Sequence, residues 1–354
     1  MILRFLIGNI HKLQPIKFFP SNSTGAVRTM SSQGRFKVFV TRNIPQPALD
    51  IISAQCDVTQ WKSDSPVPRA ELLRHIPGMH GLYCLLTDKI DAGVLDAAGP
   101  SLKVLSTMSV GYDHISLDEV KKRNIPLGYT PDVLTDATAE LTVALLLSVS
   151  RRLMEAADQV RNGGWGTWSP LWMCGVGLSN STVGIVGLGR IGMAVAQRLK
   201  PFGVKKFLYT NRNPRSDAGV LPAEYVSLDV LLNQSDFVIV CCALTPETHG
   251  LFNMDTFSKM KSSAIFINTS RGPLVNQDDL LDALESGTIR AAGLDVTTPE
   301  PIPTDHPLLE LENCVVLPHI GSATESTRID MAVLAARNLL AGLKGEKLPS
   351  EVQL

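Results

Sequence analysis

The chain has 354 residues, of which 44% are hydrophobic and 19% are charged, and its formal net charge is −1. This length is enough for two domains of ordinary size, and the composition is that of a globular protein. A net charge so close to zero gives no overall attraction to nucleic acid or to an anionic membrane, so neither is expected as a partner. The six cysteines form no C-x-x-C pair and have no histidine at a metal-like spacing, so we expect reduced core thiols and no metal site.

The first 36 residues differ in composition from the rest. They contain arginine and lysine but no aspartate or glutamate, and their serine and threonine residues cluster at 21–24 and 29–32. Acid-poor segments with arginine and serine are typical of mitochondrial transit peptides. We interpret residues 1–36 as a leader that directs a mitochondrial form of an otherwise cytoplasmic protein, or as a disordered extension, with Met30 as an alternative start.

Short β-rich runs alternate with helical patterns over the first part of the chain. Strands are predicted at 37–41, 81–87, 103–107 and 125–129, and helices at 69–76 and 117–123. Strands that alternate with helices predict a parallel sheet with both faces covered.

A mostly apolar helix and a glycine-rich connection come next. The helix after Pro131 is apolar on most faces, which predicts burial between domains or between subunits. Its apolar stretch at 141–150 is far shorter than the roughly 20 residues of a membrane span. The following connection has too many glycines for a helix to continue, and it contains Trp165, Trp168 and Trp172. Because large aromatic side chains anchor interfaces, this segment predicts a homodimer.

A second series of strands and helices follows. Strands are predicted at 182–187, 206–210, 236–241, 264–268, 291–296 and 314–317, and helices at 192–200, 278–286 and 325–343. The sequence therefore predicts an α/β protein of two doubly wound parallel-sheet domains. We place one domain at 133–324 and the other at 37–132 and 325–354, with the last helix returning to the first domain. Ligands bind beyond the carboxyl ends of such strands, so the cleft between the domains is the expected site.

The turn after the strand at 182–187 carries the pattern G-x-G-x-x-G, made of Gly187, Gly189 and Gly192 with Arg190 and Ile191 between the last two glycines. At a strand-to-helix turn this pattern predicts dinucleotide binding. Gly187 permits a tight turn, Gly189 lets the backbone approach a pyrophosphate, and Gly192 allows close packing of the helix on the strand. The backbone N–H groups at the start of the helix then face the phosphate charge.

The end of the next strand predicts which dinucleotide is bound. An NAD enzyme needs Asp or Glu about 20 residues after the glycines to bind the ribose 2′-hydroxyl, but no acid occurs between Gly187 and Ser216. The strand at 206–210 is instead followed by Asn211, Arg212 and Arg215. Guanidinium groups form charge-assisted hydrogen bonds to a 2′-phosphate, so we expect NADPH, with NADH bound more weakly.

Three polar residues, Arg271, Glu300 and His319, stand at the ends of late strands. Reduction of a 2-keto acid needs a cation for the carboxylate and carbonyl, a proton donor, and a group that keeps the donor charged. Arginine, histidine and glutamate supply those three roles. Taken separately, each residue also has an ordinary structural interpretation, as a surface ion pair, a turn residue or a strand-end histidine.

The runs around these three residues resemble the catalytic motifs of the D-isomer-specific 2-hydroxyacid dehydrogenase family. The likeness covers about residues 37–354, and within the family the chain is most similar to the eukaryotic glyoxylate/hydroxypyruvate reductases. It implies a flavodoxin-like substrate domain and a Rossmann cofactor domain with a cleft between them. The matching runs are 107–114, 128–136, 162–175, 186–192, 244–248, 268–280, 293–301 and 317–324.

The resemblance implies a role for each site residue. His319 protonates the carbonyl oxygen as hydride arrives from the nicotinamide, and Glu300 pairs with His319 and favours the imidazolium. Arg271 binds the substrate's carboxylate and carbonyl oxygens, and the backbone N–H groups of Val110 and Gly111 bind the other carboxylate oxygen. Further residues implied are Thr269, Asp295 and Gly321 beside the nicotinamide, and Ser322 and Trp168 in the substrate pocket.

The activity that the resemblance implies is NADPH-dependent reduction of glyoxylate and hydroxypyruvate. The alternatives are a D-lactate or phosphoglycerate type of dehydrogenase, and a dinucleotide-sensing co-repressor of the same fold. The chain ends at Leu354, soon after His319, without the C-terminal extensions typical of phosphoglycerate enzymes and co-repressors, which favours the reductase. In the family, 162–175 is a dimerisation arm, and Trp168 would reach the pocket of its own subunit or of its partner. Asp113 and His114 are interpreted as structural.

Overall fold

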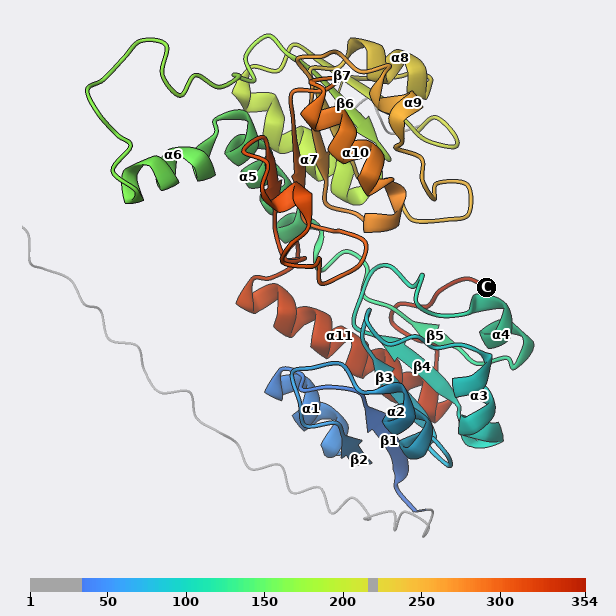
Figure 1. Ribbon diagram of the computed structural model, residues 1–354. Helices are drawn as coiled ribbons and strands as arrows, with labels where there is room; N and C mark the ends of the chain where they lie inside the picture. Colours follow the sequence, from blue (N-terminus) through green and yellow to red (C-terminus); the bar gives the residue numbers. More distant parts are fainter. Residues whose placement is uncertain (1–33, 216–221) are drawn as a thin grey trace, which may run out of the picture. The chain divides into compact units, whose positions relative to one another are not determined.

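The structure is a computed structural model in which residues 34–215 and 222–354 are described, so the leader predicted at 1–36 lies almost entirely outside the described residues. Arg35–Leu354 contains two parallel sheets with helices on both faces of each, which confirms the predicted fold class (Figure 1). In the described part of the chain, no helix is long and apolar enough to cross a membrane.

The first sheet has five parallel strands in the order β2-β1-β3-β4-β5, which is the flavodoxin-like order. The first helix, α1, packs on one face and α2 and α3 on the other, and each face has its own cluster of buried side chains. The sequence pattern does not predict β2, because it is an edge strand in which only Cys56 is buried. The bounds are β1 Phe36–Val40, α1 Gln46–Ser53, β2 Cys56–Gln60, α2 Arg69–His75, β3 Gly81–Cys84, α3 Ala92–Ala98, β4 Val104–Thr107, α4 Leu117–Lys122 and β5 Leu127–Gly128.

The last helix, α11 (Glu325–Lys344), packs against β3, β4 and α1. Its buried face is rich in alanine, which lets the helix approach the sheet closely. Hydroxyl groups of the sheet donate to carbonyls of this helix, from Ser106 to Ala335 (2.8 Å) and from Tyr83 to Ala332 (3.2 Å). The end of the chain therefore returns to the first sheet.

The second sheet has seven parallel strands in the order β12-β11-β10-β9-β6-β7-β8. The strand order reverses between β6 and β9, and a crevice at such a reversal is where doubly wound sheets bind dinucleotides. The short edge strand β8 is not predicted from the sequence, because most of it is exposed. The bounds are β6 Thr182–Val186, α7 Arg190–Leu199, β7 Lys206–Thr210, β8 Ala223–Tyr225, α8 Leu228–Gln234, β9 Phe237–Val240, α9 Met254–Phe257, β10 Ile265–Asn268, α10 Gln277–Glu285, β11 Ala291–Leu294 and β12 Cys314–Val316.

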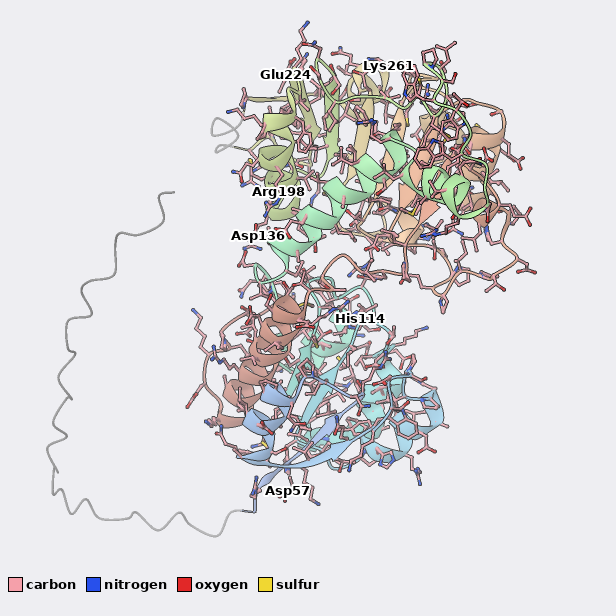
Figure 2. All side chains as sticks on the ribbon, turned by 90° about the vertical axis from the view of Figure 1, so that its left-hand side faces the viewer. Asp57, His114, Asp136, Arg198, Glu224 and Lys261 are labelled. Carbon is pink, nitrogen blue, oxygen red and sulfur yellow. The ribbon has the colours of Figure 1, made fainter. Side chains whose placement is uncertain are left out.

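The apolar helix α5 (Thr135–Ser150) differs from its predicted position between domains or subunits. Its buried residues, Leu145, Leu146 and Val149 among them, join the core of the second sheet, where α5 contacts α7, β10, β11 and β12. Neighbours on several sides explain why the helix is apolar on most faces. On its polar side, Arg198 of α7 donates to Asp136 of α5 (2.8 Å); both residues are labelled in Figure 2.

The segment that we call the arm, residues 162–175, follows helix α6 (Leu153–Arg161) and has neither helix nor strand. Its side chains are unusually exposed for aromatic residues, with Trp165 at 63% and Trp168 at 79%. All six cysteines are free thiols, but the prediction of core thiols is wrong for Cys174, which lies in the arm and is exposed. Among the described residues, the tryptophans of the arm are therefore not part of a core.

A buried asparagine ties the C-terminal segment to the first sheet. Asn338 of α11 is fully buried, donates to the Tyr129 carbonyl (2.9 Å) and accepts from the Ser350 N–H (2.8 Å). We predict that Asn338→Ala lowers the free energy of unfolding by about 2–4 kcal/mol, because two buried backbone groups lose their partner. Urea unfolding measures this. Asn233→Ala, on the exposed side of α8, is the control and should change stability by no more than about 0.5 kcal/mol; equal effects would contradict the prediction.

Candidate active site

Loops at the carboxyl ends of the strands enclose a hollow of about 90 Å³. It is lined by segments that follow β4, β10, β11 and β12 and by the start of α11, so residues far apart in sequence share one small space. The hollow brings together most of the residues predicted for substrate and nicotinamide, namely Val110, Thr269, Arg271, Asp295, His319, Gly321 and Ser322, and it also includes Ile191 of the glycine turn.

His319 is held in one orientation by two contacts. Its φ of 53° lies in the left-handed region, which costs a non-glycine residue energy and is frequent at active sites. Its backbone N–H donates to the Asp295 carbonyl (2.9 Å), and its ring Nδ1 lies 2.8 Å from Glu300 Oε2. Because a carboxylate only accepts hydrogen bonds, Nδ1–H is the donor, and Nε2 is the ring nitrogen left for another partner.

Glu300 is the ionised partner in this pair. Burial raises the pKa of Glu300, but its neighbours outweigh burial and hold the pKa below its usual value. They are His319, through its hydrogen bond and charge, the Thr297 N–H (3.1 Å) and the charge of Arg271. The carboxylate can only accept the hydrogen on Nδ1, so Nε2 is the ring nitrogen that can face a ligand in the hollow.

Arg271 extends from the loop after β10 to the loop after β4. Its Nε donates to Asp113 Oδ1 (2.9 Å) and its Nη1 to the Ser270 carbonyl (2.9 Å). Burial raises the pKa of Asp113, but the Arg271 guanidinium outweighs burial and holds it below the usual value. The third guanidinium nitrogen, Nη2, takes no part in these two bonds. It lies so close to Gly111 that a β-carbon on residue 111 would overlap with Nη2.

The loop after β4 offers backbone donors beside this guanidinium. Across residues 34–215 and 222–354, the N–H groups of Val110 and Gly111 have no hydrogen-bond acceptor. Unpaired backbone N–H groups beside a guanidinium form a typical anion-binding arrangement. The geometry of the loop therefore agrees with the substrate-binding role predicted for both residues.

Asp295 fixes the loop that carries His319. This carboxylate is buried, and its two oxygens accept from the N–H groups of Ile320 and Gly321, each at 2.8 Å. Burial raises the pKa of Asp295 in spite of these two hydrogen bonds. On the other side of the hollow the Thr269 hydroxyl bonds that of Thr142 (2.8 Å), so the loop after β10 is also anchored.

The glycine turn after β6 has the geometry that each of its glycines was predicted to need. Gly187 has φ of +96°, and a β-carbon on it would lie 2.5 Å from the Cys242 nitrogen. A β-carbon on Gly192 would lie 2.5 Å from the Gly187 carbonyl oxygen, whereas one on Gly189 would meet nothing within 4 Å. The turn is therefore closed on its protein side and open at Gly189, which fits the approach of a pyrophosphate.

A second hollow, of about 630 Å³, extends from this turn to the end of β7. Two of the residues predicted for the ribose phosphate brace the turn, because Asn211 Oδ1 accepts from the Leu188 N–H (2.7 Å) and Arg215 Nη1 donates to the Leu188 carbonyl (2.8 Å). Arg212 is exposed and lines the same hollow. The Arg190 side chain pairs with Asp132 (2.6 Å) and lines neither of the two hollows, and the cofactor-binding role of Arg190 stays a prediction.

Trp168 is the one predicted pocket residue that the structure keeps apart from the rest. It lies in the arm, is 79% exposed and does not line the hollow that holds His319. Within the described residues, then, Trp168 does not contribute to the site of its own chain.

Two charged residues that line these hollows are not predicted as site residues from the sequence. Arg328 lines the His319 hollow from the first turn of α11, and burial lowers its pKa. A cation is unfavourable at a helix N-terminus, and that unusual placement is the signal that could have identified it. Glu247 lines the cofactor hollow, and the Thr245 hydroxyl and, more weakly, Arg212 lower its pKa. In the described ranges, no group of three or more His, Cys, Asp or Glu side chains is arranged to hold a metal ion.

Comparison with known proteins gives consistent matches over most of the chain. Residues 143–321 match the family model described as D-isomer specific 2-hydroxyacid dehydrogenase, NAD binding domain. The chain is 63% identical to the glyoxylate reductase/hydroxypyruvate reductase of Homo sapiens, over 90% of this chain and 98% of that protein. It is 50% identical to the glyoxylate reductase of Thermofilum pendens, over 90% of this chain and 94% of that protein. A solved structure of an NADPH-dependent glyoxylate/hydroxypyruvate reductase of Sinorhizobium meliloti, in complex with NADP and malonate, matches with a TM-score of 0.79 at 31% identity, over 90% and 97% of the two chains.

Proposed function

Because the chain belongs to the D-isomer-specific 2-hydroxyacid dehydrogenase family, we propose that it reduces small 2-keto acids with NADPH, glyoxylate to glycolate and hydroxypyruvate to D-glycerate. The observation that carries the proposal is the 2.8 Å contact of Glu300 with His319, which lines the same hollow as Arg271. Relatives at 63% and 50% identity, named for reduction of glyoxylate or hydroxypyruvate, support this choice of substrates.

His319 is the proton donor in this proposal. NADPH, when bound, supplies the hydride that adds to the carbonyl carbon. The Nε2–H of the imidazolium protonates the carbonyl oxygen, while Glu300 holds Nδ1–H and stabilises the charged ring beforehand. The left-handed backbone at His319 and the Asp295 hydrogen bonds keep the donor in place, so little reorganisation is needed during the reaction.

Arg271 and the loop after β4 recognise the carboxylate. Nη2 of Arg271 is its least occupied donor nitrogen, and it lies against Gly111, whose N–H and that of Val110 are unpaired in the described chain. A carboxylate placed here accepts from the guanidinium and from both backbone groups, and Ser322 lines the same hollow. The carbonyl oxygen then lies between Arg271 and His319, which gives the site its requirement for a 2-keto acid.

The glycine turn and the end of β7 bind the dinucleotide. The helix that begins at Arg190 directs its first N–H groups toward the pyrophosphate, and Gly189 leaves room for it. Arg212 is the residue that meets the 2′-phosphate, with Arg215 and Asn211 fixing the turn beside it. Thr269, Asp295 and Gly321 face the nicotinamide. NADH lacks the phosphate that Arg212 binds, so it is the weaker cofactor.

The arm makes the protein a homodimer. Tryptophans that are exposed in the described part of the chain are the residue type that anchors an interface, and Trp168 completes the substrate pocket of the partner subunit. In the same proposal, 133–324 is the cofactor domain, and 37–132 with 325–354 is the substrate domain. The cytoplasmic location, with a mitochondrial form through residues 1–36, stays a prediction.

The first prediction for this function concerns cofactor choice. The wild-type enzyme should reduce glyoxylate and hydroxypyruvate with a higher kcat/KM for NADPH than for NADH. Arg212→Ala should weaken NADPH binding by roughly 1.5–3 kcal/mol, the value of hydrogen bonds to a charged group, and leave NADH nearly unchanged. Glu247→Gln, on the same hollow, is the control and should not weaken NADPH. If Arg212→Ala weakened the binding of NADPH and NADH equally, the Arg212 guanidinium would not bind the 2′-phosphate.

The second prediction concerns the arm. Trp168→Ala should impair use of the keto acid more than binding of NADPH. When Trp168→Ala and His319→Gln subunits are mixed, each mixed dimer contains one site with both defects and one site with neither. Activity should therefore return on subunit exchange, as measured by steady-state turnover alongside proof of exchange by mass spectrometry. Exchange without recovered activity would place Trp168 in the site of its own subunit.

A further inference from the structure

We propose that three side chains, His114, Thr107 and Ser109, form a hydrogen-bonded relay that holds residues 109–111 in the conformation that binds the substrate's carboxylate. These are positioning residues, since they act through the backbone of Val110 and Gly111. The inference rests on the proposed function, because it concerns how that same site recognises a 2-keto acid.

The relay is a continuous chain of contacts beneath the loop. His114 Nε2 lies 3.0 Å from the Thr107 hydroxyl, and the Thr107 hydroxyl lies 2.8 Å from that of Ser109. Ser109 donates to the carbonyl of Gly111 (2.6 Å). Thr107 is the last residue of β4 and is fully buried, so the relay begins on a rigid strand and ends on the loop. His114, labelled in Figure 2, closes the segment.

The direction of each hydrogen bond follows from the last one. A carbonyl only accepts, so the single hydroxyl hydrogen of Ser109 is used on Gly111. Ser109 must then accept from Thr107, and Thr107, its own hydrogen used, must accept from His114. His114 is therefore the tautomer with hydrogen on Nε2, and its Nδ1 carries none.

Two independent observations agree with that assignment. His114 Nδ1 is buried and has no hydrogen-bond partner in the described chain, which is tolerable for a bare nitrogen and costly for an N–H. Burial lowers the pKa of His114 to about 4, so the ring is neutral at ordinary pH. The thiol of Cys84 also contacts Thr107, but burial raises its pKa and keeps it neutral, and a neutral thiol sulfur is a weaker acceptor than the Ser109 hydroxyl oxygen.

The relay determines the loop conformation from one end while the sheet determines it from the other. The carbonyl of Ser109 accepts from the Thr130 N–H (2.9 Å), and the carbonyl of Gly111 accepts from the Ser109 hydroxyl. The peptide unit between them, which carries the Gly111 N–H, is thus held between two fixed carbonyls. Without the relay only the first of these anchors remains.

Close contact with Arg271 makes the position of this loop critical. Gly111 lies against Nη2 of Arg271 with no room for a β-carbon, so a small shift of the loop disturbs both parts of the carboxylate site. We therefore expect loss of the relay to affect keto-acid binding more than turnover of the bound substrate, and to leave NADPH binding unchanged.

The test compares two variants of Thr107 in the full-length enzyme. Thr107→Val keeps the shape of the side chain but cannot bond to Ser109 or His114, whereas Thr107→Ser keeps the hydroxyl. Thr107→Val should raise KM for glyoxylate about three- to tenfold, the effect of losing one or two neutral hydrogen bonds, with kcat less than twofold lower. Thr107→Ser should restore the wild-type KM. The dissociation constant of NADPH, measured by fluorescence titration, should be the same in all three proteins.

A second pair of variants keeps the test decisive if Thr107→Val folds poorly. His114→Gln places an amide N–H where Nε2–H was and should retain most of the wild-type KM, whereas His114→Asn places its amide at the Nδ1 position and should raise KM as Thr107→Val does. A lower kcat with unchanged KM in Thr107→Val and His114→Asn would mean that the residues serve stability alone, and would overturn the proposal. A wild-type enzyme that reduces no 2-keto acid would instead overturn the proposed function.

Discussion

The contact of the Arg271 guanidinium with the backbone of Gly111 is the constraint on which the arrangement of the site depends. The two residues come from the loops after β10 and β4, and no β-carbon fits between them. Asp113 and the Ser270 carbonyl hold the other nitrogens of Arg271, so Nη2 remains beside the loop after β4, whose N–H groups at Val110 and Gly111 are unpaired within residues 34–215 and 222–354. A glycine at 111 thus lets a cation and two backbone donors meet in a space of substrate size.

The charges around this contact are paired so that the hollow favours an anion. Glu300 is hydrogen-bonded to His319, Asp113 to Arg271, and Asp295 to two backbone N–H groups. Each carboxylate therefore has its own partner, while Arg271 keeps Nη2 and Arg328 lines the same hollow. Paired carboxylates repel an incoming carboxylate less than bare ones, and partly buried guanidiniums attract it strongly. The same pairing uses Nδ1 of His319 on Glu300, which leaves Nε2 for the role in proton donation that we propose.

The fold and the main site residues could be predicted from the sequence because their signals are local. Runs of apolar residues mark most of the strands, and Arg271, Glu300 and His319 each follow one of the strands β10, β11 and β12, so they meet at one sheet edge. The strands β2 and β8 lack that signal because edge strands bury few side chains. The pairing of Arg271 with Asp113 and the relay through His114 depend on which loops meet in space, which spacing along the chain does not encode. The apolar pattern of α5 predicts that the helix is buried, but periodicity does not indicate which elements bury it, and here they include the second sheet and α7.

The central claim is that His319 is the proton donor in an NADPH-dependent reduction of 2-keto acids. Steady-state reduction of glyoxylate and hydroxypyruvate by the wild-type enzyme and by His319→Gln, with NADPH binding measured separately, tests it most directly. The account predicts turnover by the wild type and a kcat at least ~10²-fold lower in the variant, the usual scale for a positioned general acid, with the dissociation constant of NADPH unchanged. A variant that keeps most of the wild-type kcat would contradict the account.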